Sequence, residues 1–415
     1  MSITVEEAGR RAKEASRVIS CLQSSEKDRA LEAIASALIE NSGTILEANE
    51  IDIKNGSEKG LSKAMLDRLK LSPERINGMA DAVRSVISLP DPVGTVLDGK
   101  TLPNGLKLYK TRVPLGVVAI IYEARPNVTA DAASLCLKSG NCVILKGGKE
   151  AINSNIAIAS VMRAALESTA VPPDCVQLIE DTSRAAASEL MTLNGYIDVL
   201  IPRGGAGLIK AVVKNATVPV IETGAGNCHT YVDKYADVDM AANIVFNAKT
   251  SRPSVCNACE TVIVHRDIAE KALPAIKRRL DEKNVELRGD DYARSILPDI
   301  KPAAPEDWET EYLDYILAVK TVDSIDEAIA HIARYSTGHS ECIVTGNYEM
   351  AQKFVSEVDS AAVYVNASTR FTDGGEFGFG AEIGISTQKL HARGPMGLPE
   401  LTSMKYTVYG SGQIR

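Results

Sequence analysis

Three kinds of segment are absent from this sequence of 415 residues, and each absence argues against a class of protein. No run of lysine and arginine stands out against the net charge of −8, which argues against a nucleic-acid partner. Residues 1–20 lack the apolar core of a signal peptide. The longest apolar run, residues 113–122, contains Pro114 and is too short to span a bilayer. We therefore expect no contact with nucleic acid or membrane.

Disulfide-type spacing is also missing. The eight cysteines are scattered without the intervals of a disulfide framework, so we expect reduced thiols in a cytoplasmic protein. The remaining composition, 45% hydrophobic and 24% charged residues, is ordinary for a globular protein. A chain of 415 residues exceeds a single hydrophobic core, which predicts two or three domains.

Apolar spacing predicts helices over the first ninety residues, with Ser72 as an N-cap and Pro73 at the first helical position. Strands and helices then alternate, which predicts a doubly wound parallel sheet with ligands at the carboxyl ends of its strands. A second α/β unit is expected after Asn227, with an irregular stretch over 290–311. The predicted strands are 117–122, 142–145, 176–179, 197–201, 218–221, 261–264 and 342–345.

One motif suggests a different class of enzyme. Residues 94–101, which end in Gly99-Lys100-Thr101, match the spacing of a nucleotide-binding phosphate loop. That loop needs a helix leaving it, so that backbone N–H groups face the phosphates. Pro103 follows two residues later, and no helix can begin at Thr101. A nucleotide-dependent kinase stays as an alternative that the context disfavours.

The segment 249–261 contains the residues best suited to covalent chemistry. Cys256 follows Arg252 and Pro253 and precedes an apolar strand, so a nearby cation and a junction position favour a reactive thiolate. A buried structural cysteine is the alternative. Cys259 completes a C-x-x-C pair, which leaves a zinc site with Cys228 and His229, or a redox dithiol, as further alternatives. Four good zinc ligands are not apparent, so we expect no metal.

The sequence of segment 249–261 resembles the catalytic cysteine segment of the gamma-glutamyl phosphate reductase family, a branch of the aldehyde dehydrogenase superfamily. The resemblance recurs in the same order at residues 113–127, 138–149, 227–233 and 371–404, and so covers most of the chain. It implies an α/β fold like that of aldehyde dehydrogenases. The implied domains are an NADP-binding domain (1–103 and 119–226), a catalytic domain (227–395) and a small β oligomerisation arm (104–118 and 396–415).

The resemblance also implies roles for individual residues. Cys256 is the expected nucleophile, and Asn127 the expected donor to the developing oxyanion, although asparagine here also suits a helix N-cap. Lys146 is expected on the adenosine ribose and Glu311 on the nicotinamide ribose. Lys149 lies where relatives that use NAD carry a glutamate, so we expect NADP(H). Cys259 is not required by the family pattern and is interpreted as a packing residue.

The remaining candidates concern anions. The predicted strand 197–201 leads through Gly204 and Gly205 into a predicted helix, a geometry that suits a cofactor phosphate, although a simple tight turn explains it equally. Arg252, His391 and Arg393 are candidates for binding substrate phosphate or carboxylate. Glu222 lies where hydrolytic relatives carry a general base, and we expect it to serve as scaffold or cofactor contact instead.

The expected reaction is therefore reduction of L-glutamyl 5-phosphate to L-glutamate 5-semialdehyde with NADPH, in proline biosynthesis. An acylating aldehyde dehydrogenase that uses coenzyme A is the alternative within the same fold. Half-polar strands at 106–113 and 403–409 lie where the superfamily has its oligomerisation arm, so a homo-oligomer, dimer or tetramer, is expected. The lability of an acyl phosphate leaves a contact with glutamate 5-kinase open.

Overall fold

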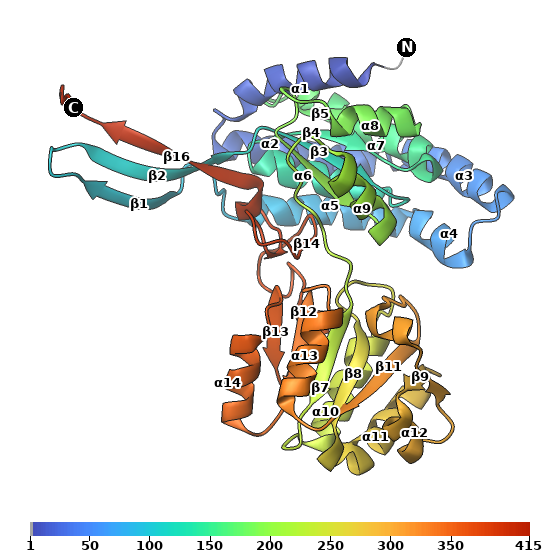
Figure 1. Ribbon diagram of the computed structural model, residues 1–415. Helices are drawn as coiled ribbons and strands as arrows, with labels where there is room; N and C mark the ends of the chain where they lie inside the picture. Colours follow the sequence, from blue (N-terminus) through green and yellow to red (C-terminus); the bar gives the residue numbers. More distant parts are fainter. Residues whose placement is uncertain (1–2) are drawn as a thin grey trace. The chain divides into compact units, whose positions relative to one another are not determined.

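The computed structural model describes residues 3–415, so the first two residues of the predicted domain 1–103 lie outside the described part. The chain divides into two compact units (Figure 1). The first unit contains the chain up to Thr223 together with residues 378–384 and 396–415. The second contains residues 224–377 and 385–395. Each unit is described separately below.

The first unit begins with the predicted helices. The hydroxyl of Ser72 accepts the N–H of Arg75 and Pro73 opens α5, as expected from an N-cap followed by proline. Further helices lie between the strands of its sheet. The helices are α1 Val5–Ile19, α2 Ser24–Glu40, α3 Ser42–Glu58, α4 Lys63–Leu69, α5 Pro73–Ser88, α6 Asn127–Lys138, α7 Ile152–Leu166, α8 Arg184–Met191 and α9 Ala206–Asn215, with short 3-10 turns η1 Lys149–Ala151, η2 Pro173–Cys175 and η5 Pro399–Leu401.

A parallel sheet of four strands in the order β5-β4-β3-β6 forms the centre of this unit. The strands are β3 Val117–Tyr122, β4 Cys142–Lys146, β5 Val176–Leu178 and β6 Val199–Arg203. Every residue of β3 and β4 is buried, which requires cover on both faces. The prediction of a strand at 218–221 was wrong, because this stretch makes only one isolated bridge, between Leu200 and Val220.

An antiparallel sheet in the order β1-β2-β16 extends from the same unit (Figure 1). Its strands are β1 Val96–Thr101, β2 Lys107–Pro114 and β16 Thr402–Tyr409. The motif 94–101 is therefore mainly an exposed edge strand, from which no helix leaves, and this geometry argues against a nucleotide phosphate loop. The strands predicted near 106–113 and 403–409 are confirmed and pair with each other.

The second unit is built on a parallel sheet of seven strands in the order β10-β9-β11-β8-β7-β12-β13. Its strands are β7 Cys228–Val232, β8 Cys259–His265, β9 Glu286–Gly289, β10 Lys301–Pro302, β11 Ile316–Val322, β12 Ser340–Val344 and β13 Ala362–Val365. Its helices are α10 Val238–Thr250, α11 Arg266–Asp281, α12 Asp291–Ile296, α13 Ile325–Tyr335 and α14 Tyr348–Glu357, with η3 Pro305–Glu309 and η4 Thr369–Phe371. The stretch 290–311 is thus not irregular throughout, since it contains α12, β10 and η3.

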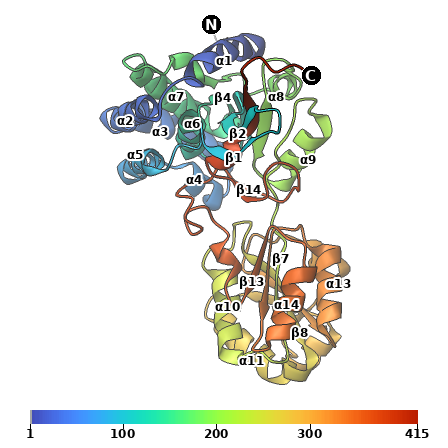
Figure 2. The same ribbon diagram turned by 90° about the vertical axis from the view of Figure 1, so that its left-hand side faces the viewer.

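Alternating side chains of β8 divide the core of this unit into two layers. Val262 and Val264 pack with α10 and α11, whereas Ile263 packs with α13 and α14. Figure 2 shows α10 and α13 on opposite sides of β7 and β8. Because successive residues of a strand point to opposite faces, this alternation buries both faces of the sheet and leaves the loops at its ends to carry chemistry.

Residues 371–404 are largely loop, with two short strands, β14 Ile385–Ser386 and β15 Gly394–Pro395. None of the helices within residues 3–415 has the length and apolar character needed to cross a membrane.

Candidate active site

Cys256 lies in the turn between the C-terminus of α10 and the start of β8, and its side chain is half-exposed. Its backbone carbonyl oxygen accepts a hydrogen bond from the thiol of Cys228, at 3.2 Å. The same oxygen lies so close to Gly226 that a β-carbon added to this glycine would overlap it. The backbone of the predicted nucleophile is therefore held by β7 and by the loop that precedes it, while the residue as a whole is only partly buried.

Glu311 stabilises the other side of Gly226. Its Oε1 accepts the N–H of Gly226 at 2.8 Å, and thereby connects the segment 309–313 to the glycine that contacts Cys256. The structure thus places Glu311 beside the nucleophile's backbone. Its expected contact with a nicotinamide ribose stays a prediction.

Asn257, the residue after Cys256, joins the cysteine loop to the η4 segment. Its side-chain amide donates to the carbonyl oxygens of Thr372, at 2.9 Å, and of Arg370, at 3.3 Å. Its backbone carbonyl accepts the hydroxyl of Thr369 at 2.7 Å. In return, the guanidinium of Arg370 donates to the side-chain oxygen of Asn257 and to the hydroxyl of Ser251, the latter at 3.0 Å. These reciprocal bonds fix the half-buried Arg370 guanidinium against both ends of the cysteine loop.

Charges of both signs act on the Arg370 guanidinium. Burial is the main cause that lowers the pKa of Arg370, and the exposed Arg252 lowers it further. Negative charge on Asp373, Cys256 or Glu376 acts in the opposite direction. Arg252 and Arg370 are therefore both within electrostatic range of a shared region beside the nucleophile, and a nearby cation favours the thiolate form of a cysteine.

A fully buried ion pair lies directly behind the cysteine loop. The ammonium of Lys249, in the last turn of α10, is 2.5 Å from a carboxylate oxygen of Glu260 in β8. The Lys249 ammonium also lies over the ring of Tyr312, 5.8 Å from its centroid. Burial raises the pKa of Glu260 to about 7, although Lys249 opposes this shift. The pair connects the elements on both sides of the segment 251–258.

The neighbouring cysteines are arranged for packing. Cys259 is buried, donates to the carbonyl oxygen of Thr261 at 3.3 Å, and has its pKa raised to about 12 by burial. Cys228 bonds the Cys256 carbonyl, whereas the next residue, His229, pairs with Glu341 at 3.1 Å. Within residues 3–415 no group of three or more metal-binding side chains gathers. The interpretation of Cys259 as a packing residue fits this geometry better than a zinc site or a redox dithiol.

The candidates His391 and Arg393 both lie in the glycine-rich segment 371–404. Arg393 pairs with Asp359, its Nη2 lying 2.8 Å from a carboxylate oxygen, and Lys389 binds the same carboxylate. His391 is exposed and adopts a positive φ of 68°. The structure therefore gives Arg393 a carboxylate partner within its own unit. Roles for His391 and Arg393 in substrate binding stay predictions.

In the first unit, Asn127 is the first residue of α6 and follows the carboxyl end of β3. The N-cap is Pro126, so the alternative interpretation of Asn127 as the cap of this helix was wrong. Its side-chain amide instead donates to Asp131, one turn later, at 2.8 Å. Burial raises the pKa of Asp131 to about 6. The amide of Asn127 is thus held by a partly buried carboxyl group, which limits its rotation.

The four candidate cofactor residues of the first unit, Lys146, Lys149, Gly204 and Gly205, lie at or shortly after the carboxyl ends of strands of its parallel sheet. Lys146 ends β4, and Lys149 opens η1 shortly after it; Lys146 is buried and Lys149 is exposed. Gly205 caps α9 after β6, and its N–H donates to the carboxylate of Glu123 at 3.0 Å. A β-carbon at Gly204 would meet the same side chain at 2.6 Å. A helix N-terminus that binds a carboxylate has the chemistry to bind a phosphate, so these residues fit a dinucleotide.

Sequence reasoning missed several residues that the structure brings to the cysteine loop. Gly226 and Arg370 are far from Cys256 along the chain and were not predicted to contact it, and Cys228 was considered only as a ligand of an alternative zinc site. Arg370 precedes the glycine-rich stretch, where a lone arginine among Ser368, Thr369 and Phe371 was a weak signal. Gly226 ends a run of small residues, and nothing in that run indicates which backbone it approaches.

Comparison with known proteins agrees with this arrangement. The model of the aldehyde dehydrogenase family matches residues 2–295. The chain is 60% identical to a gamma-glutamyl phosphate reductase of Lachnospira eligens, over 99% of both chains. It superposes on the crystal structure of gamma-glutamyl phosphate reductase from Thermotoga maritima with a TM-score of 0.98 and 51% identity over the whole of both chains. An acetylating aldehyde dehydrogenase of Geobacillus thermoglucosidasius shares the fold, with a TM-score of 0.71 and 19% identity over 99% of this chain and 97% of that one.

The match to the family model exceeds half of the chain, and the high identity extends over nearly all of it. The half-exposed Cys256, fixed in its loop by Gly226 and Cys228, lies where the motif of this family predicts a nucleophile. The chain belongs to the aldehyde dehydrogenase family and, within it, to the gamma-glutamyl phosphate reductases.

Proposed function

We propose that the protein reduces L-glutamyl 5-phosphate to L-glutamate 5-semialdehyde and inorganic phosphate, as a step of proline biosynthesis. The observation that carries this proposal is the partly buried Cys256, whose backbone carbonyl is held by Cys228, in a chain 60% identical to a gamma-glutamyl phosphate reductase. An acyl phosphate is already activated. The protein therefore needs a thiolate, a donor to the oxyanion and a placed hydride carrier.

The chemistry at Cys256 is an acyl transfer followed by a reduction. The thiolate attacks the acyl carbon, the S–C bond forms, and the C–O bond to the phosphoryl group breaks with its electron pair leaving on phosphate. A bound nicotinamide cofactor would supply the hydride that reduces the thioester carbon. The C–S bond of the resulting thiohemiacetal then breaks, which releases the aldehyde and returns the Cys256 thiolate. Arg252 favours the thiolate by its charge, and the amide of Asn127 is our candidate donor to the oxyanion, where one such donor contributes about 3 kcal/mol.

We propose NADP(H) as the cofactor. Lys149 is exposed at the start of η1, close in sequence to the buried Lys146 that ends β4. An exposed cation near the adenosine ribose attracts a 2′-phosphate, whereas a glutamate would repel it. Gly204 and Gly205 at the N-terminus of α9 are our candidates for the pyrophosphate, and Glu311 for the nicotinamide ribose.

The reverse reaction tests the proposal and avoids the unstable acyl phosphate. We would follow NADPH formation from glutamate semialdehyde and NADP+, with and without phosphate, for the wild type and for Cys256→Ala. Phosphate-dependent NADPH that disappears in the variant is the expected result. Reduction of NADP+ that depends on coenzyme A and not on phosphate would indicate the acylating alternative. Full activity of Cys256→Ala would show that Cys256 is not the nucleophile.

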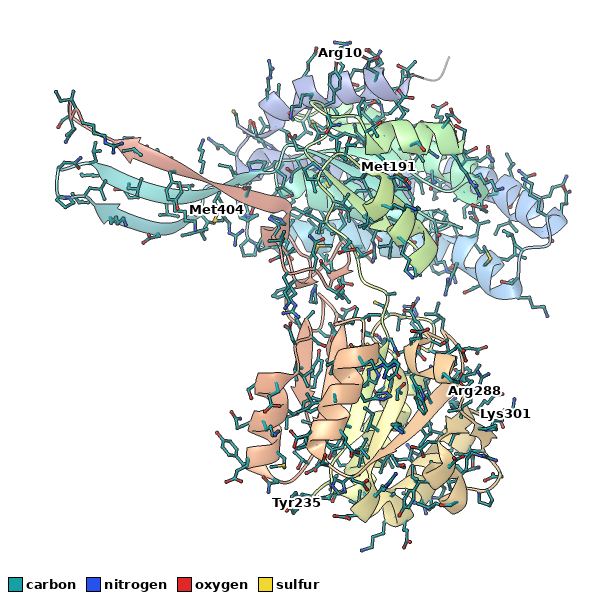
Figure 3. All side chains as sticks on the ribbon, viewed as in Figure 1. Arg10, Met191, Tyr235, Arg288, Lys301 and Met404 are labelled. Atoms are coloured by element: carbon teal, nitrogen blue, oxygen red, sulfur yellow. The ribbon has the colours of Figure 1, made fainter. Side chains whose placement is uncertain are left out.

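We also propose that the protein forms a homo-oligomer, a dimer or tetramer, through its antiparallel sheet. β16 is an edge strand with exposed apolar side chains, among them Met404 (Figure 3), Tyr406 and Val408. An exposed apolar edge needs a partner strand.

A contact with glutamate 5-kinase is a further proposal, since it would shorten the path of a labile acyl phosphate. The described residues contain no disulfide, which fits a proposed cytoplasmic location.

A further inference from the structure

We propose that Arg370 binds the phosphate group of the acyl phosphate and, in the reverse direction, positions inorganic phosphate to attack the thioester on Cys256. This inference rests on the proposed function, because it assigns a residue to the leaving group of that reaction. It concerns a side chain that the sequence motifs did not indicate, and it depends only on contacts within the second unit.

The first argument is the way in which Arg370 is anchored. Its Nε donates to the hydroxyl of Ser251 at 3.0 Å, and its Nη1 donates to the side-chain oxygen of Asn257. Ser251 is the C-cap of α10, and Asn257 directly follows Cys256, so the two partners flank the nucleophile along the chain. A guanidinium held at both ends of the seven-residue segment 251–257 has a fixed position beside the loop that contains Cys256.

The second argument is that these two partners are neutral. A hydroxyl oxygen and an amide oxygen orient the guanidinium without cancelling its charge. Asn257 can present its oxygen to Arg370 because its amide nitrogen already donates to the carbonyls of Thr372 and Arg370. The cation is therefore oriented for a further, anionic ligand, and arginine is the side chain whose planar fork best matches a phosphate.

The third argument is the second cation. Arg252 is close enough to Arg370 to disfavour its charged form, and burial has the same effect. An anion that contacts both guanidinium groups would offset the effect of Arg252 on Arg370, and a phosphate dianion offers more charge and more acceptor oxygens than a carboxylate. A thiolate at Cys256 raises the pKa of Arg370, as Asp373 and Glu376 also do. The hydrogen bond from Arg370 to Asn257, the residue after Cys256, places this anion site near the cysteine.

The chemistry distinguishes phosphate from the substrate's own carboxylate. When Cys256 attacks, the S–C bond forms at the carbon that bears the phosphate oxygen, so the phosphorus is two bonds from the attacked carbon. The α-carboxylate of the glutamyl group is separated from that carbon by three other carbons. A cation anchored to the residue next to Cys256 is therefore better placed for the phosphate. As the C–O bond breaks, the departing phosphate gains negative charge, which Arg370 stabilises.

The test is a comparison of Michaelis constants in the reverse reaction for Arg370→Gln and Arg370→Lys. We expect the KM for phosphate to rise at least about tenfold in Arg370→Gln, since a charge-assisted hydrogen bond is worth roughly 1.5–3 kcal/mol. We expect the rise for phosphate to exceed any rise for the semialdehyde by about tenfold. Arg370→Lys retains the positive charge without the planar fork of arginine. Its KM for phosphate should therefore lie between that of the wild type and that of Arg370→Gln. Arg266→Gln, which alters a surface pair with Asp323 in the same unit, is the matched control.

Two outcomes would overturn the inference: an unchanged KM for phosphate in Arg370→Gln, or a larger rise in the KM of the semialdehyde, which would assign Arg370 to the carboxylate. Failure of the proposed function looks different. The wild type would then lack both the phosphate dependence and the stoichiometric burst of NADPH that forms without phosphate when the thioester accumulates on Cys256.

A measurement on the wild type keeps the inference testable if the variants do not fold. Alkylation of Cys256 by iodoacetamide, a neutral reagent, is followed by mass spectrometry at increasing inorganic phosphate and constant ionic strength. A phosphate bound by Arg370 draws positive charge away from the thiolate and covers it, so saturable slowing is expected. Equal rates in phosphate and in chloride would contradict a phosphate site beside Cys256.

Discussion

Gly226 lies directly against the backbone carbonyl of Cys256, with no room between them for a β-carbon. The N–H of the same glycine donates to Glu311, and the carbonyl that it contacts accepts the thiol of Cys228. The nucleophile's backbone is therefore positioned by residues from two other segments of the second unit. This arrangement is stabilising only if position 226 stays without a side chain, because any added atom meets backbone and not a movable side chain.

Gly226→Ala is expected to impair both stability and activity. The methyl group would overlap the Cys256 carbonyl, so the cysteine loop must shift. Overpacking of this kind costs about 1–3 kcal/mol or more. A displacement of the nucleophile by roughly 1 Å lowers the rate about a hundredfold. Urea unfolding and the rate of NADPH formation in the reverse reaction measure the two effects.

Gly78→Ala is the matched control for that substitution. Gly78 lies within α5, is exposed, and has no neighbouring atom near the position of an added β-carbon. Alanine should stabilise the helix there by roughly 0.5–1 kcal/mol and leave the rate unchanged. If Gly226→Ala left stability and rate as little impaired as Gly78→Ala does, the close approach of Gly226 to Cys256 would not be needed for either.

The two cysteines of the C-x-x-C pair should respond differently to alanine. Cys256→Ala is expected to lower the rate by at least about a thousandfold, since the reaction loses its nucleophile. Cys259 is buried and packs in β8, so Cys259→Ala should cost about 1 kcal/mol of stability and change the rate only a few-fold. Initial rates and thermal melts of both variants check this. A folded Cys259→Ala protein without activity would support a dithiol role.

Lys149→Glu should shift the cofactor preference. The exposed ammonium at the start of η1 is our candidate for attracting the 2′-phosphate of NADP, and a carboxylate would repel it. We expect the ratio of kcat/KM for NADP+ to that for NAD+ to fall at least about tenfold. Lys63→Glu, at an exposed lysine of α4, is the control for the change in net charge. An unchanged ratio in Lys149→Glu would assign the discrimination to another residue.

Asp131 gives the stability a defined pH dependence. Burial raises its pKa in the folded protein to about 6, from an ordinary value of 3.8. Between these values the folded state binds more protons than the unfolded state, so the stability from this group is greatest below the lower value and is lost as the pH rises through about 6. The melting temperature of the wild type minus that of Asp131→Asn should therefore increase as the pH is lowered from about 7 to 5. A constant difference across this range would show that Asp131 has an ordinary pKa.

The buried pair of Lys249 and Glu260 should be sensitive to the loss of one partner. At about pH 8, above the pKa of about 7 for Glu260, the carboxylate is the counter-charge of a fully buried ammonium. Glu260→Gln is expected to cost about 3–5 kcal/mol because an uncompensated charge stays buried. The double variant Lys249→Met with Glu260→Leu should recover part of this loss. The free energies of unfolding in urea of the wild type and of both variants test this expectation. Equal values for the wild type and Glu260→Gln would show that the buried ammonium does not need the carboxylate.

Much of the architecture could be predicted from the sequence because it depends on local pattern. The strand at 117–122, the N-cap at Ser72 and the alternation of strands and helices follow from apolar spacing and turn residues. The strand predicted at 218–221 failed because a short apolar run does not show whether a neighbouring strand is available to pair with it. The cap predicted at Asn127 failed because Pro126 took that position.

The sequence by itself determined the family of the protein and indicated Cys256 as the candidate nucleophile. Cys256, Arg252 and Pro253 stand within five residues of one another, and the motif that contains them marks the family without reference to coordinates. Their chemistry follows from residue type and spacing, both of which are properties of a continuous segment.

Only the tertiary structure decided what surrounds that nucleophile. Gly226, Cys228, Glu311 and Arg370 reach the cysteine loop from separate segments of the second unit. Contacts between residues far apart in the chain depend on strand order and loop paths, and a single sequence carries no local pattern for these. The physical reason is that a close backbone approach or a hydrogen bond is a property of two positions at once, and folding alone brings the two together.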